Sequence, residues 1–299
     1  MGGSFRPYWR YGMIPFIREQ LFRAAGRVLV RRVRDVSLGG RVFRVNEFEV
    51  TRMNHYTHDA DDFYVNVHLN TEMELPTNRD TVLHFFEQLK KGFPELRNFH
   101  TRENGDLVLE GDKEEHSSRW IAIEPRRLCS GHTNPESLEE AYRQHETVLD
   151  LAPPLLTISL LDCEALDVMY GFDFTYGGNH DEVVAEALGV GSALEGFLEL
   201  PRTRVVNYEP SLTLALDDSY QLQCRLSIET RTSAYQVRTG EYAEDQISVY
   251  FTVRQYWGSG PDRSFLESFR RQREVGEEIL RRAVIPRVVR PLAQVIASR

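Results

Sequence analysis

Residues 211–228, SLTLALDDSYQLQCRLSI, alternate apolar and polar side chains on both sides of an Asp217-Asp218-Ser219 turn. The leucines at 212, 214 and 216 share one face of the first run, and Leu222–Ile228 repeats the alternation in the second. A period of two is that of a β-strand, and two such runs joined by a short polar turn are typical of a hairpin. The segment therefore predicts antiparallel sheet in this part of the chain.

Working outward from this hairpin, the hydrophobic spacing predicts further strands and helices. Further strands are expected over residues 41–51, 63–72, 106–110, 119–124, 155–175 and 247–256. Helices are expected over residues 13–34, 78–91, 134–149, 180–188 and 264–284. Gly177-Gly178-Asn179 is read as a turn, residues 150–154 as a linker, and Pro286 and Pro291 as interruptions of the tail.

Two of these helices carry start signals. Thr77 with Asp80 has the form of a capping box, and the helix that follows places Val82, Phe85, Phe86 and Leu89 on one stripe. Asn134 followed by Pro135 has the form of an N-cap with proline at the first helical position. The alternation of Val65, Val67 and Leu69 with polar residues predicts a strand with one buried face.

The order of elements in the first half of the chain is similar to that in the second. A shift of 128 residues superposes Leu138-Glu139 on Leu266-Glu267, Arg143-Gln144 on Arg271-Gln272, and residues 119–126 on 247–254. Such matches predict an internal duplication, and coincidence among the many possible offsets is the alternative. We expect an α+β fold with two similar halves, each an antiparallel sheet with packed helices. The expected domains are a basic amphipathic arm over 1–40, a first half over 41–152 and a second half over 153–299.

Several phrases of the sequence resemble a sporadically distributed bacterial family of similar length with no assigned function. They are His84–Leu89 followed by Gly92-Phe93-Pro94, the lone Trp120 in a strand before a helix, the strand Leu222–Ser227, and the Leu266-Glu267 helix after Val249–Val253. The resemblance covers roughly residues 45–285 and consists of order and hydrophobic pattern. It implies an architecture and supplies no catalytic residue.

Charge is segregated along the chain. Residues 1–44 contain ten Arg and two acidic residues, and residues 263–299 contain nine Arg and four Glu. The stretch between them carries 17 basic and 39 acidic residues, although the whole chain has a net charge of only −9. Opposite charge blocks guide association, so the basic ends are the first candidates for contact with a partner.

The expected helix over 13–34 combines an apolar stripe with arginines that lie mostly off it, as in a basic amphipathic helix. Its candidate partner-binding residues are Arg18, Leu21, Phe22, Arg23, Arg27, Arg31 and Arg32. Three alternatives are a helix that folds back onto the acidic body, a helix on a membrane surface, and nucleic-acid binding. The acidic middle of the chain weighs against a polyanionic partner.

Composition excludes several classes of protein. No apolar run reaches the length of a membrane span, and arginines run through the N-terminus where a secretory signal would be apolar. Cys129, Cys163 and Cys224 form no paired motif, which favours a reducing compartment and a cytoplasmic location. The sequence lacks G-x-S-x-G, Walker, H-E-x-x-H and C-x-x-C motifs, so no cofactor is expected.

Two segments are weak candidates for chemistry. The segment 55–62 gathers two imidazoles and three carboxylates that could bind a metal ion: His55, His58, Asp59, Asp61 and Asp62. Cys129 and His132 place a thiol and an imidazole before an expected helix N-terminus, where a thiol pKa would fall. The alternatives are a solvated loop for the first segment and an ordinary helix-entry loop for the second.

Taken together, these features favour a non-catalytic binding or assembly protein that docks to a protein partner, or to itself, through its basic ends. A metal-dependent or thiol hydrolase that uses the segment 55–62 or Cys129 with His132 is the alternative. Nucleic-acid binding through the Arg-rich termini is the third hypothesis.

Overall fold

The structure is a computed structural model that describes residues 32–38, 41–47, 59–112, 116–257 and 264–299, the first two ranges by their backbone only. The chain divides into two units, Met1–Thr51 and Arg52–Arg299. In the first unit, β1 (Arg32–Leu38) and β2 (Arg41–Glu47) form an antiparallel hairpin with Arg32 opposite Glu47. The expected strand over 41–51 is thus confirmed over β2.

The helix expected over 13–34 is wrong at its C-terminal end, because residues 32–34 belong to strand β1. Val33 and Val36 are three apart, as on a helical stripe, but Val36-Ser37-Leu38 alternates as a strand does. Arg32 therefore lies in a hairpin. The other candidate partner-binding residues of this segment lie outside the described residues: Arg18, Leu21, Phe22, Arg23, Arg27 and Arg31.

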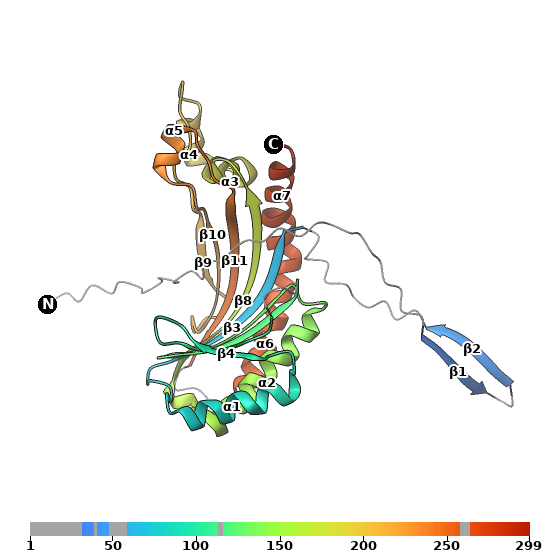
Figure 1. The fold of residues 1–299 in the computed structure, drawn as a ribbon. Helices are drawn as coiled ribbons and strands as arrows, with labels where there is room; N and C mark the ends of the chain where they lie inside the picture. Colours follow the sequence, from blue (N-terminus) through green and yellow to red (C-terminus); the bar gives the residue numbers. More distant parts are fainter. Residues whose placement is uncertain (1–31, 39–40, 48–58, 113–115, 258–263) are drawn as a thin grey trace. The chain divides into compact units, whose positions relative to one another are not determined.

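The second unit is built on a nine-stranded antiparallel sheet with the order β4-β5-β6-β7-β3-β8-β11-β10-β9 (Figure 1). The bounds are β3 (Asp62–Thr71), β4 (Asn98–Thr101), β5 (Leu107–Glu110), β6 (Ser118–Glu124), β7 (Arg127–Thr133), β8 (Cys163–Tyr176), β9 (Ser211–Ala215), β10 (Leu222–Glu229) and β11 (Asp245–Tyr256). The α+β class and the hairpin over 211–228 are confirmed. The two expected sheets are instead one sheet, because β3 pairs with β8 at its centre.

The helices lie between and after these strands. They are α1 (Arg79–Gly92), α2 (Leu138–Leu156), α3 (His180–Leu188), α4 (Ser192–Leu198), α5 (Ala234–Thr239), α6 (Phe265–Ile279) and α7 (Arg290–Ala297), with a 3-10 turn at Leu160–Asp162 and a π-helical segment at Leu280–Val289. No helix in the described ranges has the length and apolar character of a membrane span.

Helices α2 and α6 pack on the same face of the sheet. The Gln144 side chain of α2 contacts Ser130, which lies opposite Val67 in the β3–β7 pair. Gly276 of α6 contacts the ring of Tyr170, which lies opposite Val65 in the β3–β8 pair. Residues opposite each other share a face, and Val65 and Val67 point the same way, so both helices cover the apolar face of the central strands.

Two predictions about helix N-caps change. Helix α1 buries the expected stripe, but its N-cap is Asn78, which accepts from the N–H groups of Asp80 and Thr81, and Thr77 does not cap it. The N-cap of α2 is Ser137, while Asn134 ends strand β7 and accepts a hydrogen bond from the Phe63 N–H at 2.9 Å. In each case a polar residue further along the chain caps the helix, and the helix begins directly after that cap.

The linker expected over 150–154 is wrong, because Pro153 and Pro154 lie inside helix α2. Leu149, Ala152 and Leu156 remain buried on its core face, so packing continues through the prolines. The boundary between the two expected halves at 152/153 consequently falls within a helix. Likewise Pro286 does not end the last helix: the chain continues through the π-helical segment into α7, a distortion that fits the missing proline N–H.

The C-terminal basic block is paired with acidic side chains of the same unit. Arg270 binds Glu146 at 2.9 Å, Arg290 binds Asp59 at 3.2 Å, and Arg299 binds Glu186. These pairs are solvent-accessible and contribute little stability individually. For this end of the chain, the basic segment folds onto the acidic body.

Candidate functional site

Cys129 and His132 are not brought together. Both lie in β7, where residues three apart point to opposite faces of the sheet. The Cys129 Sγ faces Glu124 at 3.4 Å, and burial raises the pKa of this thiol well above its ordinary value. The prediction of a helix-entry loop with an activated thiol is wrong, because the segment is a strand near the centre of the sheet.

The described carboxylates of the segment 55–62 hold strand ends in place. Asp59 pairs with Arg290, Asp61 accepts from the Thr175 N–H at 2.7 Å, and Asp62 accepts from the Asn134 amide at 2.7 Å. His55 and His58 lie outside the described residues. Within the described ranges, no three His, Cys, Asp or Glu side chains are grouped as metal ligands.

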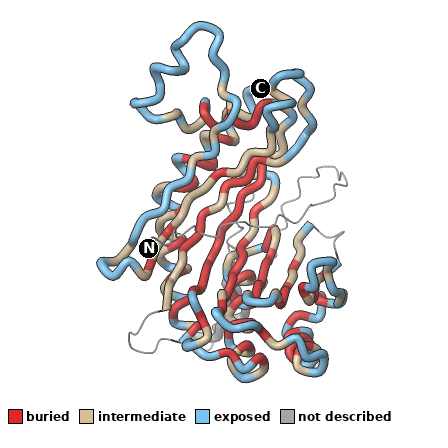
Figure 2. The backbone as a smooth tube through the Cα atoms, turned by 90° about the vertical axis from the view of Figure 1, so that its left-hand side faces the viewer, coloured by how far each residue is buried: buried red, intermediate tan, exposed pale blue. Residues whose placement is uncertain are grey.

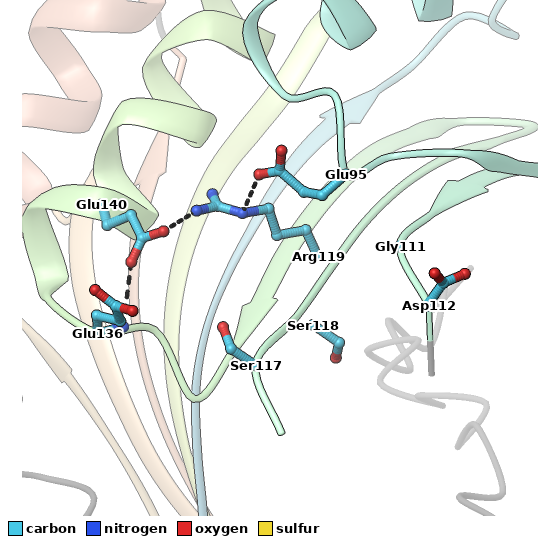
Figure 3. A pocket seen from close by; sticks show the side chains of 8 residues that line it. All are labelled: Glu95, Gly111, Asp112, Ser117, Ser118, Arg119, Glu136 and Glu140. Atoms are coloured by element: carbon cyan, nitrogen blue, oxygen red, sulfur yellow. Dashed lines mark hydrogen bonds and ion pairs between the residues drawn. The ribbon is translucent and has the colours of Figure 1, made fainter. Parts of the chain in front are cut away.

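A polar cavity of about 230 Å³ opens beside Arg119 (Figure 3). Its lining residues are Glu95, Gly111, Asp112, Ser117, Ser118, Arg119, Glu136 and Glu140. They come from the loop after α1, from the connection between β5 and β6, from the start of β6, and from the N-terminal end of α2 with the residues before it. Because these segments are far apart in the sequence, no spacing pattern announces the cavity.

Arg119 is the centre of this cavity and is only 7% exposed. Its guanidinium binds Glu95 at 2.7 Å, Glu140 of α2, and the Gln144 side-chain oxygen at 3.2 Å, and it lies 5.3 Å from the centre of the Phe93 ring. Charge-assisted hydrogen bonds of this kind fix a guanidinium in one orientation. Arg119 thus joins β6, α2 and the loop after α1.

Ser117, on the cavity wall, lies next to His132, with 3.1 Å between the Ser117 Oγ and the His132 Nε2. A serine nucleophile needs a base with a pKa near the working pH and a third group that orients the base. Burial, with a contribution from Arg119, lowers the pKa of His132 to about 2. Its Nδ1 has no hydrogen-bond partner within the described part of the chain. The pair therefore lacks two properties of an activated serine.

The network continues into the core between α2 and β7. Ser130 Oγ lies 2.9 Å from the His145 Nδ1, and Gln144 donates to Ser130 and to the Gly131 carbonyl, each at 3.0 Å. Burial lowers the pKa of His145 to about 3, so this imidazole is neutral. These contacts satisfy buried polar groups and align the helix with the sheet.

The opposite face of the sheet carries polar and aromatic side chains at its centre. Arg254 donates two hydrogen bonds of 2.5 Å to Asp167, directly across β8 and β11, and Asn70 donates to the same carboxylate at 3.1 Å. Asp167 is 1% exposed. Residues Asn66 and His68 on this face are also buried, so the expected strand with one buried face is buried on both.

The outermost strand β9 is exposed, unlike the buried groups described above. Every residue of β9 is exposed (Figure 2). Leu212 and Leu214 expose 56% and 49% of their surface. They lie opposite Leu226 and Cys224 of β10. Since Cys224 lies in turn opposite the buried Val253, these leucines are on the face that α2 and α6 cover elsewhere. We call Leu212 and Leu214, with the backbone edge of β9 that pairs with no other strand in the described ranges, the β9 edge.

The comparisons with known proteins give no family. The chain matches none of the known protein families, and no curated protein is similar to it in sequence. Among solved structures, an alkyldihydroxyacetonephosphate synthase aligns with a TM-score of 0.14 and 10% identity over 79% of this chain. The alignment covers 44% of the length of the synthase chain. A likeness at this level supports no statement about fold or function.

Proposed function

We propose that this protein is a non-catalytic binding or assembly protein that docks to a protein partner through the β9 edge. The observation that carries the proposal is the exposure of Leu212 and Leu214 on the otherwise helix-covered face of the sheet. An edge strand offers unpaired N–H and C=O groups, and proteins recognise such edges by adding a strand.

The other edge of the sheet supports this choice by contrast. β4 is shorter, its sequence is Asn-Phe-His-Thr, and Arg97 and Arg102 flank it. Short strands and flanking charge are the usual protection of an edge against pairing. The segment 210–216 carries no charge and begins with Pro210. Glu209 and Asp217 flank it, and both carboxylates accept backbone N–H groups of the same chain.

The cavity at Arg119 supports a structural role and argues against the hydrolase alternative. Its cation is bound by carboxylates of this chain, its serine lies beside a histidine that is a very weak base, and Cys129 lies on the other face. Docking through the Arg-rich N-terminal segment and nucleic-acid binding stay predictions, because residues 1–31 lie outside the described ranges.

We also infer that the sheet arose by internal duplication. Outward from the centre, the strands run β3, β7, β6, β5, β4 on one side and β8, β11, β10, β9 on the other. Each series starts with its central strand and a helix, α1 or α3, and has a long helix, α2 or α6, after its remaining strands, while α4 and α5 occur only in the second series. The offset of 128 relates Gln144 to Gln272, and both buried amides donate to strand carbonyls. By sequence, the same offset superposes β6 on β11. By position in the sheet, however, the strand that corresponds to β11 is β7. The order of elements therefore supports a duplication more strongly than the sequence offset does.

Photo-crosslinking in cells tests the docking proposal. A photoreactive amino acid at Thr213 is expected to give covalent adducts with protein, because this residue is at the centre of the free edge. The same amino acid at His100, at the β4 edge, is the matched control and is expected to give few adducts. Equal yields at the two positions, or none at Thr213, would contradict the proposal.

A further inference from the structure

We propose that the partner at the β9 edge is a second copy of this chain, paired antiparallel about a twofold axis at Thr213. This inference rests on the proposed function and names its partner. The two sheets would join into one continuous sheet across the dimer.

The backbone pattern identifies which groups face outward. The Leu216 N–H donates to the Leu222 carbonyl at 2.8 Å, and the Pro210 carbonyl accepts from the Ile228 N–H at 3.1 Å. In an antiparallel strand, alternate residues direct both backbone groups to the same side. Even-numbered residues of this strand therefore bond to β10. The N–H and C=O groups of Ser211, Thr213 and Ala215 point away from it, toward the free edge.

The strand is self-complementary in this register. Its sequence, Ser-Leu-Thr-Leu-Ala, is nearly symmetric about Thr213. A twofold axis there makes Thr213 and Thr213 of the partner subunit a hydrogen-bonded pair, which exchanges both backbone bonds. It places Leu212 opposite Leu214 of the partner subunit, and Ser211 opposite Ala215 of the partner subunit. Closed twofold contacts require this kind of self-complementarity.

The placement of the apolar side chains favours the same arrangement. The twofold axis runs through the sheet from face to face, so the leucines of both copies lie on one face and form cross-strand pairs. A shift by one residue would place leucines of one copy opposite threonine and serine of the other. The leucines of the two copies would then lie on opposite faces of the joined sheet, so the register is specified. Residues 210–216 carry no charge. The register brings Glu209 opposite Asp217 of the partner subunit just beyond the paired strands, and within its own chain Glu209 accepts from the Thr230 N–H and Asp217 from the Gln221 N–H.

Cysteine substitution at the axis tests the register with purified full-length protein. Opposed residues in a hydrogen-bonded pair have Cα atoms about 5.5 Å apart, within the range of a disulfide. Thr213→Cys is therefore expected to form a disulfide-linked dimer under mild oxidation. Ser211→Cys is the matched control: residue 211 lies about 14 Å from its own copy, since four residues of strand separate them. A mixture of Ser211→Cys with Ala215→Cys is expected to form the mixed dimer.

Mass measurement by light scattering, over a hundredfold range of concentration, provides the second test. The wild-type chain of 34.7 kDa is expected to double its mass as concentration rises. Thr213→Pro, which lacks the central N–H, is expected to stay monomeric with an unchanged unfolding curve, and His100→Pro is expected to dimerise. A monomer at every concentration, or disulfide yields equal at 211 and 213, would overturn the second-copy inference.

The cellular crosslinks separate this failure from failure of the proposed function. If the adducts at Thr213 contain only other proteins and the purified chain is monomeric, the inference of a second copy is overturned. Docking of a protein through the β9 edge would then still be supported. Absence of any adduct at Thr213 would overturn both.

Discussion

The centre of the sheet buries ionisable side chains, whereas the β9 edge exposes leucines, which is the reverse of the usual relation between polarity and burial. Asp167 and His68, which are ionisable, are 1% and 6% exposed at the centre, while Leu212 and Leu214 are about half exposed at the edge. Both regions have clear strand patterns. The difference teaches that burial in this protein follows a strand's position in the sheet more than its residue types.

The central carboxylate of Asp167 tolerates burial because it is paired and hydrogen-bonded, and an aromatic ring covers the neighbouring strand. Asp167 is held by Arg254 and Asn70, and the ring of Tyr64 lies over Gly171 of the neighbouring strand. A buried charge is stable only when it is paired and hydrogen-bonded. The β9 edge lacks an equivalent cover among the described residues, so the two regions respond differently to substitution.

The largest effect is expected from breaking the central ion pair. Asp167→Ala leaves the Arg254 guanidinium partly buried without its carboxylate, so we expect the free energy of unfolding to fall by about 3–5 kcal/mol. Urea denaturation measures it. Glu278→Ala, which removes the exposed partner of Arg281 and Arg282, is the control and is expected to cost less than about 1 kcal/mol. Equal losses would show that burial at the centre does not strengthen this pair.

Acid is expected to destabilise the protein through its buried histidines. Burial lowers the pKa values of His68 and His145 to about 3 and of His132 to about 2. Below pH 6.5 the unfolded chain takes up protons that the folded chain does not, so stability falls with pH. Asp173, whose pKa burial raises to about 6, opposes this loss between pH 6 and 4.

We expect a net loss of about 2–4 kcal/mol between pH 7 and 5, since each histidine contributes up to about 1.4 kcal/mol per pH unit. Urea midpoints across this range measure the loss. His145→Gln is expected to flatten the dependence, whereas Leu214→Thr at the edge should leave its slope unchanged. A slope unaffected by His145→Gln would contradict the assignment.

Substitution of the glycines that lie under aromatic rings is expected to lower the free energy of unfolding by an intermediate amount. A Cβ at Gly131 would lie 2.2 Å from the Trp120 ring, and one at Gly171 would lie 2.1 Å from the Tyr64 ring. Alanine at either position must displace a ring from the central face, so we expect a loss of about 1–3 kcal/mol in thermal or urea unfolding. Gly92→Ala has no atom within 4 Å of the new Cβ and is expected to be neutral or slightly stabilising.

The smallest effect on monomer stability is expected at the β9 edge. Leu214 and Val253 lie in one cross-strand row on the same face, with Cys224 between them. Val253→Thr buries a hydroxyl and is expected to cost about 1–3 kcal/mol. Leu214→Thr is expected to change the unfolding free energy of the monomer by less than about 0.5 kcal/mol while weakening self-association. A large loss for Leu214→Thr in dilute protein would show that the edge belongs to the core.

Features that depend on neighbouring residues could be predicted from the sequence. The hairpin 211–228, the stripe of α1, the helix over 180–188 (α3), and the strand 247–256 all appear in the structure. Turn chemistry, capping and period act over a few residues, so a local pattern determines them.

Strand β7 could not be predicted in this way. Arg-Leu-Cys-Ser-Gly-His-Thr lacks alternation because both of its faces are buried, by α2 on one side and by Trp120 on the other. The same reason applies to the linker expected over 150–154. Its prolines read as a break, but burial of Leu149 and Ala152 against the sheet stabilises the helix beyond them.

The sequence by itself determined the class of fold, most of the strands and helices, and the segregation of charge. The tertiary structure alone decided that β3 and β8 join the two halves into one sheet, that Arg119 gathers carboxylates from distant segments, and that Leu212 and Leu214 lie uncovered. These features depend on contacts between residues far apart in the chain, which local periodicity does not encode. Which strand becomes an edge is therefore a property of the assembled sheet.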